Sequence, residues 1–89
     1  MSKKLLYFTA KWCGPCQQIK PFFYELEKKY TDISFSAIDV EMNPSFAERY
    51  NIKSLPTFIA LDDNNQEVKR FSKADPNKLV SLVEELNAL

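Results

Sequence analysis

The chain has no histidine and only one glycine, and its apolar stretches are short. Without histidine it lacks the most frequent general base and the most frequent metal ligand of proteins. No apolar stretch approaches the roughly 20 residues that a membrane-spanning helix needs. Lys and Arg together number 12, as do Asp and Glu, so the formal net charge is zero. This balance gives no reason to expect nucleic acid or an acidic membrane as a partner.

The length of 89 residues predicts one domain that spans residues 1–89. A composition that is 45% hydrophobic and 13% aromatic indicates a globular chain. Lys3 and Lys4 precede a short apolar run, which imitates a signal peptide only faintly because the run is too short. We therefore expect a cytoplasmic monomer. In a reducing compartment, two cysteines serve catalysis or metal binding more often than structure.

Hydrophobic periodicity and turn residues predict seven elements. The strands are expected at residues 4–10, 33–40, 57–61 and 66–71, and the helices at 15–30, 44–50 and from 76 onward. Asn43 is a candidate N-cap, and Asp75 with Pro76 starts the last helix. Pro21 should kink the first helix. The order β-α-β-α-β-β-α predicts an α/β fold, a four-stranded mixed sheet flanked by three helices.

Both cysteines lie in the segment Trp12-Cys13-Gly14-Pro15-Cys16, at the predicted junction of strand and helix. Two thiols at this spacing can close into a disulfide and open again. The N–H groups and dipole of a helix N-terminus favour a thiolate at Cys13, and Lys11 adds positive charge. We therefore expect Cys13 to be the nucleophile. Cys16, one turn further into the helix, should be the more buried, resolving thiol.

The neighbours of the cysteines have expected roles as well. Gly14 should let the chain turn without a Cβ clash, and Pro15 suits a first helical turn because it has no N–H to lose. Trp12 should cover the reactive thiol or contact a partner. Asp39 and Glu41 could relay protons to the thiols, but an ordinary role at the end of a strand is favoured.

Two other uses of the cysteine pair are disfavoured. A structural disulfide around so small a loop would stabilise the chain little. A zinc site needs four ligands, and two cysteines without histidine do not supply them. We expect no metal and no cofactor.

The five-residue segment resembles the motif of thioredoxins without a change. Three further matches lie in register: Pro21 within the first helix, Asn43-Pro44 at the start of the second, and Leu55-Pro56-Thr57-Phe58. The resemblance runs from about Leu5 to the C-terminus and implies the thioredoxin fold. It also implies a cis peptide bond before Pro56, packing of this proline against the cysteines, exclusion of metal from the thiols, and pairing of the Leu55 backbone with a substrate chain.

The departures from the family pattern are specific. Only 12 residues precede Cys13, so we expect a short variant that lacks the first strand and helix of the family, as in the shorter core of glutaredoxins. Tyr7 stands where thioredoxins carry a buried Asp, and Ala37 replaces its Lys neighbour. Lys73 stands in the loop before the last helix, on a rim that substrates usually touch, and predicts a preference for acidic partners.

The resemblance implies a thiol–disulfide oxidoreductase that reduces disulfides of protein substrates, with ribonucleotide reductase among the targets. A flavoprotein thioredoxin reductase would supply the electrons. One alternative is a glutaredoxin-like enzyme that uses glutathione, and another is a non-catalytic binding subunit with the same fold. Because the family's Asp is absent, another group must take the proton of Cys16. The sequence leaves two candidates, water and the departing thiolate.

Overall fold

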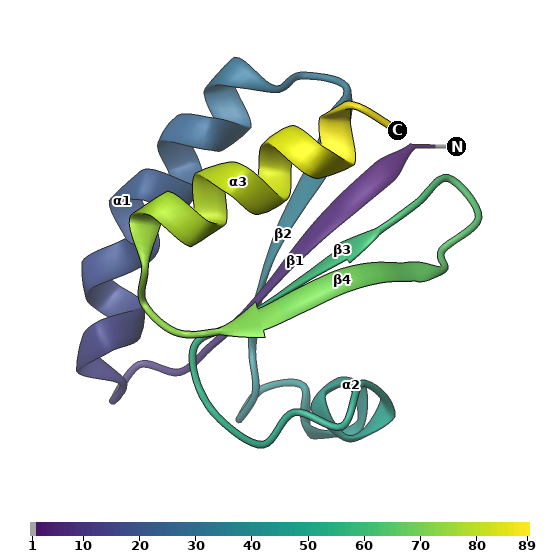
Figure 1. The fold of residues 1–89 in the computed structure, drawn as a ribbon. Coiled ribbons are helices and arrows are strands. Elements are labelled where there is room, and N and C mark those ends of the chain that lie inside the picture. Colours follow the sequence, from purple (N-terminus) through teal and green to yellow (C-terminus); the bar gives the residue numbers. More distant parts are fainter. Residues whose placement is uncertain (1) are drawn as a thin grey trace.

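A computed structural model describes residues 2–89 and contains the seven elements in the predicted order (Figure 1). They are β1 (Lys3–Thr9), α1 (Gly14–Lys29), β2 (Ile33–Asp39), α2 (Pro44–Arg49), β3 (Thr57–Leu61), β4 (Glu67–Ser72) and α3 (Pro76–Asn87). The predicted fold class, a four-stranded mixed sheet with three helices, is confirmed. None of the helices in residues 2–89 is long and apolar enough to cross a membrane.

The sheet has the strand order β2-β1-β3-β4. β1 is parallel to β2, as the crossover through α1 predicts, and antiparallel to β3, which in turn is antiparallel to β4. Helices α1 and α3 lie on one face of the sheet and α2 on the other (Figure 1). Tyr7 in the centre of β1 lies opposite Ala37 on β2 and Phe58 on β3.

The larger core lies between the sheet and the pair α1 and α3. Helix α1 buries four residues one turn apart, and it continues through Pro21 to Lys29. Aromatic rings fill the centre: the Tyr7 ring stacks on Phe58 at a centroid distance of 5.0 Å and lies 4.8 Å from Phe23. This packing fixes the position of β1 against the start of α1, where both cysteines lie.

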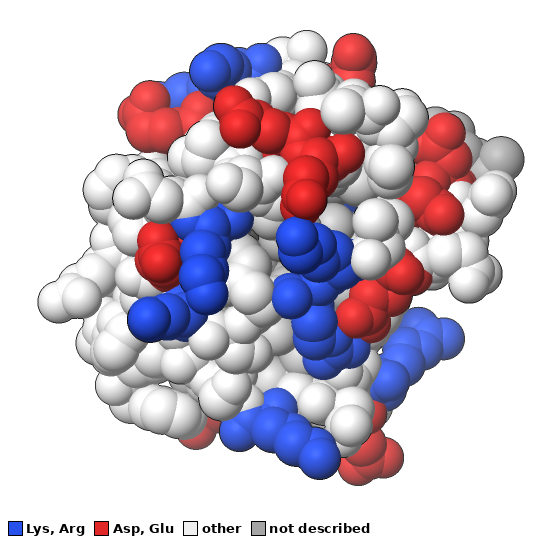
Figure 2. Space-filling view, viewed as in Figure 1, with Lys and Arg blue, Asp and Glu red and all other residues white. Residues whose placement is uncertain are grey.

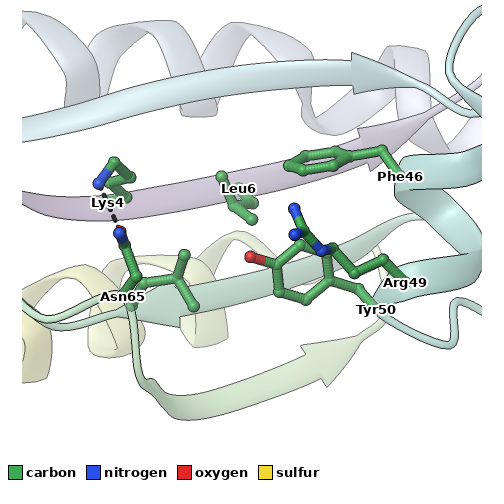
Figure 3. Close-up of a pocket in the computed structure, with 7 residues that line it drawn as sticks. Lys4, Leu6, Phe46, Arg49, Tyr50 and Asn65 are labelled. Atoms are coloured by element: carbon green, nitrogen blue, oxygen red, sulfur yellow. Dashed lines mark hydrogen bonds between the residues drawn. The ribbon is translucent and has the colours of Figure 1, made fainter.

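The smaller core lies on the face that α2 covers. Phe46 of this short helix and Tyr50, its C-cap residue, pack on Phe8, with ring centroids 6.0 and 5.8 Å from that of Phe8. Beyond α2 the face is open, and a cavity of about 460 Å³ is bordered there by Lys4 and Arg49 (Figure 3). Leu6 and Leu61 of the sheet also line this cavity.

The two helix starts that carry Asn43 and Asp75 differ. The Asp75 carboxylate accepts hydrogen bonds from the backbone N–H groups of Asn77 at 3.0 Å and Lys78 at 3.2 Å, which caps α3. Asn43 occupies the N-cap position of α2, but its side chain makes no capping bond. It donates instead to the Asp39 carbonyl at 3.1 Å. The predicted N-cap position of Asn43 is therefore confirmed, although its side chain does not cap the helix.

Charges are mixed over the surface. Figure 2 shows basic side chains gathered over β4 beside acidic side chains over α3. Lys69 of β4 and Glu85 of α3 form an ion pair across this boundary, with an N–O distance of 3.1 Å. The pair is exposed on both sides, so it contributes little to stability.

Candidate redox site

Cys13 and Cys16 form a disulfide at the N-terminus of α1, with their Cα atoms 5.2 Å apart. Cys13 is the N-cap residue, and its sulfur accepts a hydrogen bond from the backbone N–H of Cys16 at 3.2 Å. Pro15 lies in the first helical turn, where its missing N–H costs no hydrogen bond, as expected. The sulfur of Cys13 thus faces the donor end of a helix, which favours negative charge.

The two cysteines differ slightly in burial. The exposed fraction is 5% for Cys13 and zero for Cys16, so the order matches the prediction. Both pack in a small apolar cluster with Ala10, and Val40 and Leu55 lie against it. The cluster excludes water from Cys16 and leaves Cys13 as the half of the pair nearer to the surface.

The peptide bond between Leu55 and Pro56 is cis, as the family resemblance implies. Thr57, which follows, is buried, and its hydroxyl lies 2.7 Å from the Ser54 carbonyl and 2.7 Å from the Ser72 hydroxyl. These contacts tie the loop before β3 to the end of β4. They hold Leu55 against the cysteine cluster.

A shallow apolar cavity of about 300 Å³ opens beside Cys13. Trp12, whose side chain is 67% exposed, forms one wall, and Leu55 forms part of the other. Lys53 is a lining residue that sequence reasoning missed, because a lone lysine in a loop carries no signal of its position. The remaining lining residues are Val40, Ala47, Ile52 and Ser54.

The structure does not bring all expected site residues into this cavity. Lys73 is exposed but is not among the lining residues. It follows Ser72, which pairs with Thr57 directly after Pro56. Lys73 therefore lies one residue beyond the Thr57–Ser72 pair, which directly follows the cis proline.

The steric reason given for Gly14 is wrong. A Cβ atom placed on Gly14 would meet no heavy atom within 4 Å, and no glycine has a positive φ. The fold therefore leaves room for a side chain at this position.

Tyr7 occupies the position at which the family carries a buried acid. Its side chain is 1% exposed, and its hydroxyl donates a hydrogen bond to the Cys16 carbonyl at 2.5 Å. Burial raises the pKa of the Tyr7 phenol above its ordinary value of 10.0. The Tyr7 phenol therefore keeps its proton at physiological pH and donates a hydrogen bond. It does not accept the proton of Cys16, as a carboxylate at this position would.

Asp39 is engaged at the end of β2. Its Oδ1 accepts hydrogen bonds from the backbone N–H groups of Glu41 at 2.8 Å and Met42 at 3.2 Å. This arrangement caps the turn that follows the strand. It favours the strand-end role over the proton relay.

The thioredoxin family model matches residues 1–85. Thioredoxin of Pongo abelii is 40% identical over 79 residues, which cover 89% of this chain and 74% of that protein. Thioredoxin of Ophiophagus hannah is 44% identical over 72 residues, covering 81% of this chain and 68% of that protein.

Solved structures agree with this match. The germline-specific thioredoxin Deadhead from Drosophila melanogaster superposes with a TM-score of 0.91 at 34% identity, covering 96% of this chain and 81% of that chain. Mitochondrial thioredoxin 3 from Saccharomyces cerevisiae superposes with a TM-score of 0.89 at 30% identity, covering 94% of this chain and 78% of that chain. The chain belongs to the thioredoxin family and is a thiol–disulfide oxidoreductase that acts through the Cys13–Cys16 pair.

Proposed function

We propose that Cys13 is the attacking thiol and Cys16 the resolving thiol in the reduction of protein disulfides. The observation that carries this assignment is the position of Cys13 as N-cap of α1, beside the open cavity. The thiolate is the attacking species in disulfide exchange, and a helix N-terminus favours it. Cys16 has no exposed surface, which favours attack on a substrate by Cys13.

The reaction has two exchange steps. The Cys13 thiolate attacks one sulfur of the substrate disulfide, a mixed disulfide forms, and the other substrate sulfur leaves as a thiolate that takes up a proton. Cys16 then loses its proton and attacks the Cys13 sulfur. The second substrate sulfur leaves and is protonated, and Cys13 and Cys16 are left as a disulfide. Two electrons pass from the dithiol to the substrate.

We propose that the substrate chain binds across the cavity beside Cys13. Trp12 and Leu55 offer apolar surface there, and the Leu55 backbone offers hydrogen bonds to an extended segment. Gly14 and Pro15 keep the approach to the sulfur clear, since neither adds a long side chain. Lys73, exposed one residue beyond the Thr57–Ser72 pair, favours partners with acidic surfaces.

The electron donor that we propose is a flavoprotein thioredoxin reductase, and ribonucleotide reductase is a target. Glutathione is the competing donor, because glutaredoxin-like enzymes use it. Residues 1–89 act in this proposal as one domain and as a monomer, since one chain carries both cysteines and the cavity. A cytoplasmic location fits a dithiol that must be kept reduced.

An insulin reduction assay with each donor tests this function. We expect turnover with NADPH and a thioredoxin reductase, and little turnover when glutathione and its reductase replace them. The double variant Cys13→Ser with Cys16→Ser should be inactive in both. Turnover with glutathione and its reductase, but none with thioredoxin reductase, would assign the chain to the glutaredoxin-like class instead. If the wild type reduces no insulin and the double variant still binds its partner fully, the chain is a binding subunit.

A further inference from the structure

The hydroxyl of Tyr7 donates a hydrogen bond to the backbone carbonyl of Cys16. The two residues lie nine positions apart, one in the centre of β1 and the other in the first turn of α1. Both are almost fully buried. This bond is a direct polar link from the sheet to the resolving cysteine.

The donor is held in place by its surroundings. The Tyr7 ring stacks on Phe58 of β3 with an interplanar angle of 10°, and Phe23 of α1 packs against it at 47°. Ala37, its neighbour on β2, is small. The ring therefore has little freedom to turn, and its oxygen stays within hydrogen-bond distance of the Cys16 carbonyl. The Thr9 side chain is the other polar neighbour of this hydroxyl.

A fixed donor at this carbonyl affects the sulfur of the same residue. In the second exchange step Cys16 carries developing negative charge while its own carbonyl oxygen, also partly negative, lies a few bonds away. An O–H group that donates to the carbonyl withdraws electron density from it and lowers this repulsion. The same bond holds the first turn of α1, and with it the sulfur, toward Cys13.

We propose that Tyr7 is a positioning residue of the resolving step: its hydroxyl, acting through the Cys16 carbonyl, holds Cys16 ready to attack the mixed disulfide, and no carboxylate base takes part. The proposal rests on the roles assigned above to Cys13 and Cys16. In this step the Cys16–H bond breaks, a bond between the two cysteine sulfurs forms, and the bond to the substrate sulfur breaks. The proton ends on the departing substrate thiolate.

The groups around Tyr7 agree with this route. A cavity of about 270 Å³ opens at its flank, and Asp39 is the one carboxylate among its described lining residues. The Oδ1 atom of Asp39 is already engaged by two backbone N–H groups. The other titratable residues that line this cavity are Lys11, Lys20 and Tyr24. On the β3 side Tyr7 meets the apolar ring of Phe58.

The test uses dithiobis-nitrobenzoate in a rapid-mixing experiment on the fully reduced protein. The first nitrothiobenzoate is released when Cys13 attacks the reagent, and the second when Cys16 attacks the resulting mixed disulfide. The two releases therefore report the two steps separately. Tyr7→Phe keeps the ring and removes only the oxygen, so it is the informative variant.

We expect Tyr7→Phe to slow the second release about 3- to 10-fold, the factor that one neutral hydrogen bond provides, and to leave the first release unchanged. Tyr50→Phe, which removes a hydroxyl on the α2 side, should change neither. Asp39→Asn should leave the pH dependence of the second release unchanged. Tyr7→fluorotyrosine, a stronger donor of the same shape, should restore the second release at least to the wild-type rate.

Three results would overturn the proposal. The first is an unchanged second release in Tyr7→Phe. The second is equal slowing of both releases with a matching loss in Tm, which marks a purely structural role. The third is a shifted pH profile in Asp39→Asn. Failure of the assigned cysteine roles is tested separately with the two single-thiol variants, each of which can release only one nitrothiobenzoate. With the assigned roles Cys16→Ser keeps the fast first release and Cys13→Ser loses it, and the reverse result would overturn the roles themselves.

Discussion

The sulfur of Cys13 accepts a hydrogen bond from the backbone N–H of Cys16 at 3.2 Å. The pair is thus joined through the backbone as well as through its disulfide. Because the donor is a main-chain group, it survives replacement of either side chain. The backbone contribution to a Cys13 thiolate can therefore be separated from the chemistry of the second sulfur.

Cys16→Ser should accumulate a mixed disulfide between Cys13 and the substrate. The variant keeps the N–H donor at position 16 and so keeps the thiolate, but it lacks the sulfur that releases the substrate. Mass spectrometry after incubation with oxidised insulin measures the adduct. Cys13→Ser serves as the control and should give almost none. An adduct on Cys13→Ser and none on Cys16→Ser would reverse the assignment.

Lys73→Ala should lower the rate of reduction of acidic protein substrates by a few-fold at low ionic strength. Lys73 is exposed, and an exposed charge near a binding site acts mainly on the rate of association, which salt reduces by screening. The measurement is kcat/KM for an acidic and a neutral substrate at two salt concentrations. Lys28→Ala, in the last turn of α1, is the matched control. Unchanged rates for the acidic substrate at low salt would refute the role of Lys73.

Asp75→Ala should lower the free energy of unfolding by about 1 kcal/mol, since two backbone N–H groups at the start of α3 lose their acceptor. Urea unfolding followed by circular dichroism gives the value. Asp75→Asn keeps an acceptor and should retain most of the stability. Asn43→Ala should cost less than Asp75→Ala, because Asn43 makes no capping bond.

The pair of Glu67 and Arg70 should contribute to stability only above acidic pH. A hydrogen bond from Arg70 holds the pKa of Glu67 below its ordinary value of 4.5. A carboxyl group whose pKa is lower in the folded state stabilises the fold above its unfolded pKa, and this contribution is lost as pH falls through the folded pKa. Both side chains are about one-third exposed, so the effect is at most about 1 kcal/mol.

Urea unfolding of wild type and Glu67→Gln across the acid range measures that contribution. The difference between the two proteins should be present at neutral pH and vanish below the folded pKa of Glu67. A difference that grows toward acid pH would have the wrong sign for this pair. Glu84→Gln on α3 provides a control for the loss of one negative charge.

Patterns that depend on local spacing were predictable from the sequence. The alternation in β4, the turn before it and the Asp75-Pro76 start of α3 determine their elements almost alone. The cis bond before Pro56 came only through the family resemblance, because nothing local distinguishes it. Lys53 and the bond from Tyr7 to Cys16 were not predictable, since both arise where segments distant in sequence meet.

Gly14 and Asn43 show the limit of residue preferences. Glycine suggests a tight turn and asparagine a cap, yet a Cβ at Gly14 meets no neighbour and the Asn43 amide binds the Asp39 carbonyl. In each case the residue type correctly indicates the start of a helix. The interaction it makes depends on where the surrounding elements lie.

The N-cap position of Cys13 links the free energy of folding to the affinity of the chain for electrons. Folded and unfolded, oxidised and reduced states form a thermodynamic cycle. An interaction that stabilises the thiolate only in the folded state favours the folded dithiol over the folded disulfide, by the free energy of that interaction. The fold then raises the reduction potential of the pair. A substitution that frays the first turn of α1 should therefore make the chain a stronger reductant even while it weakens the fold.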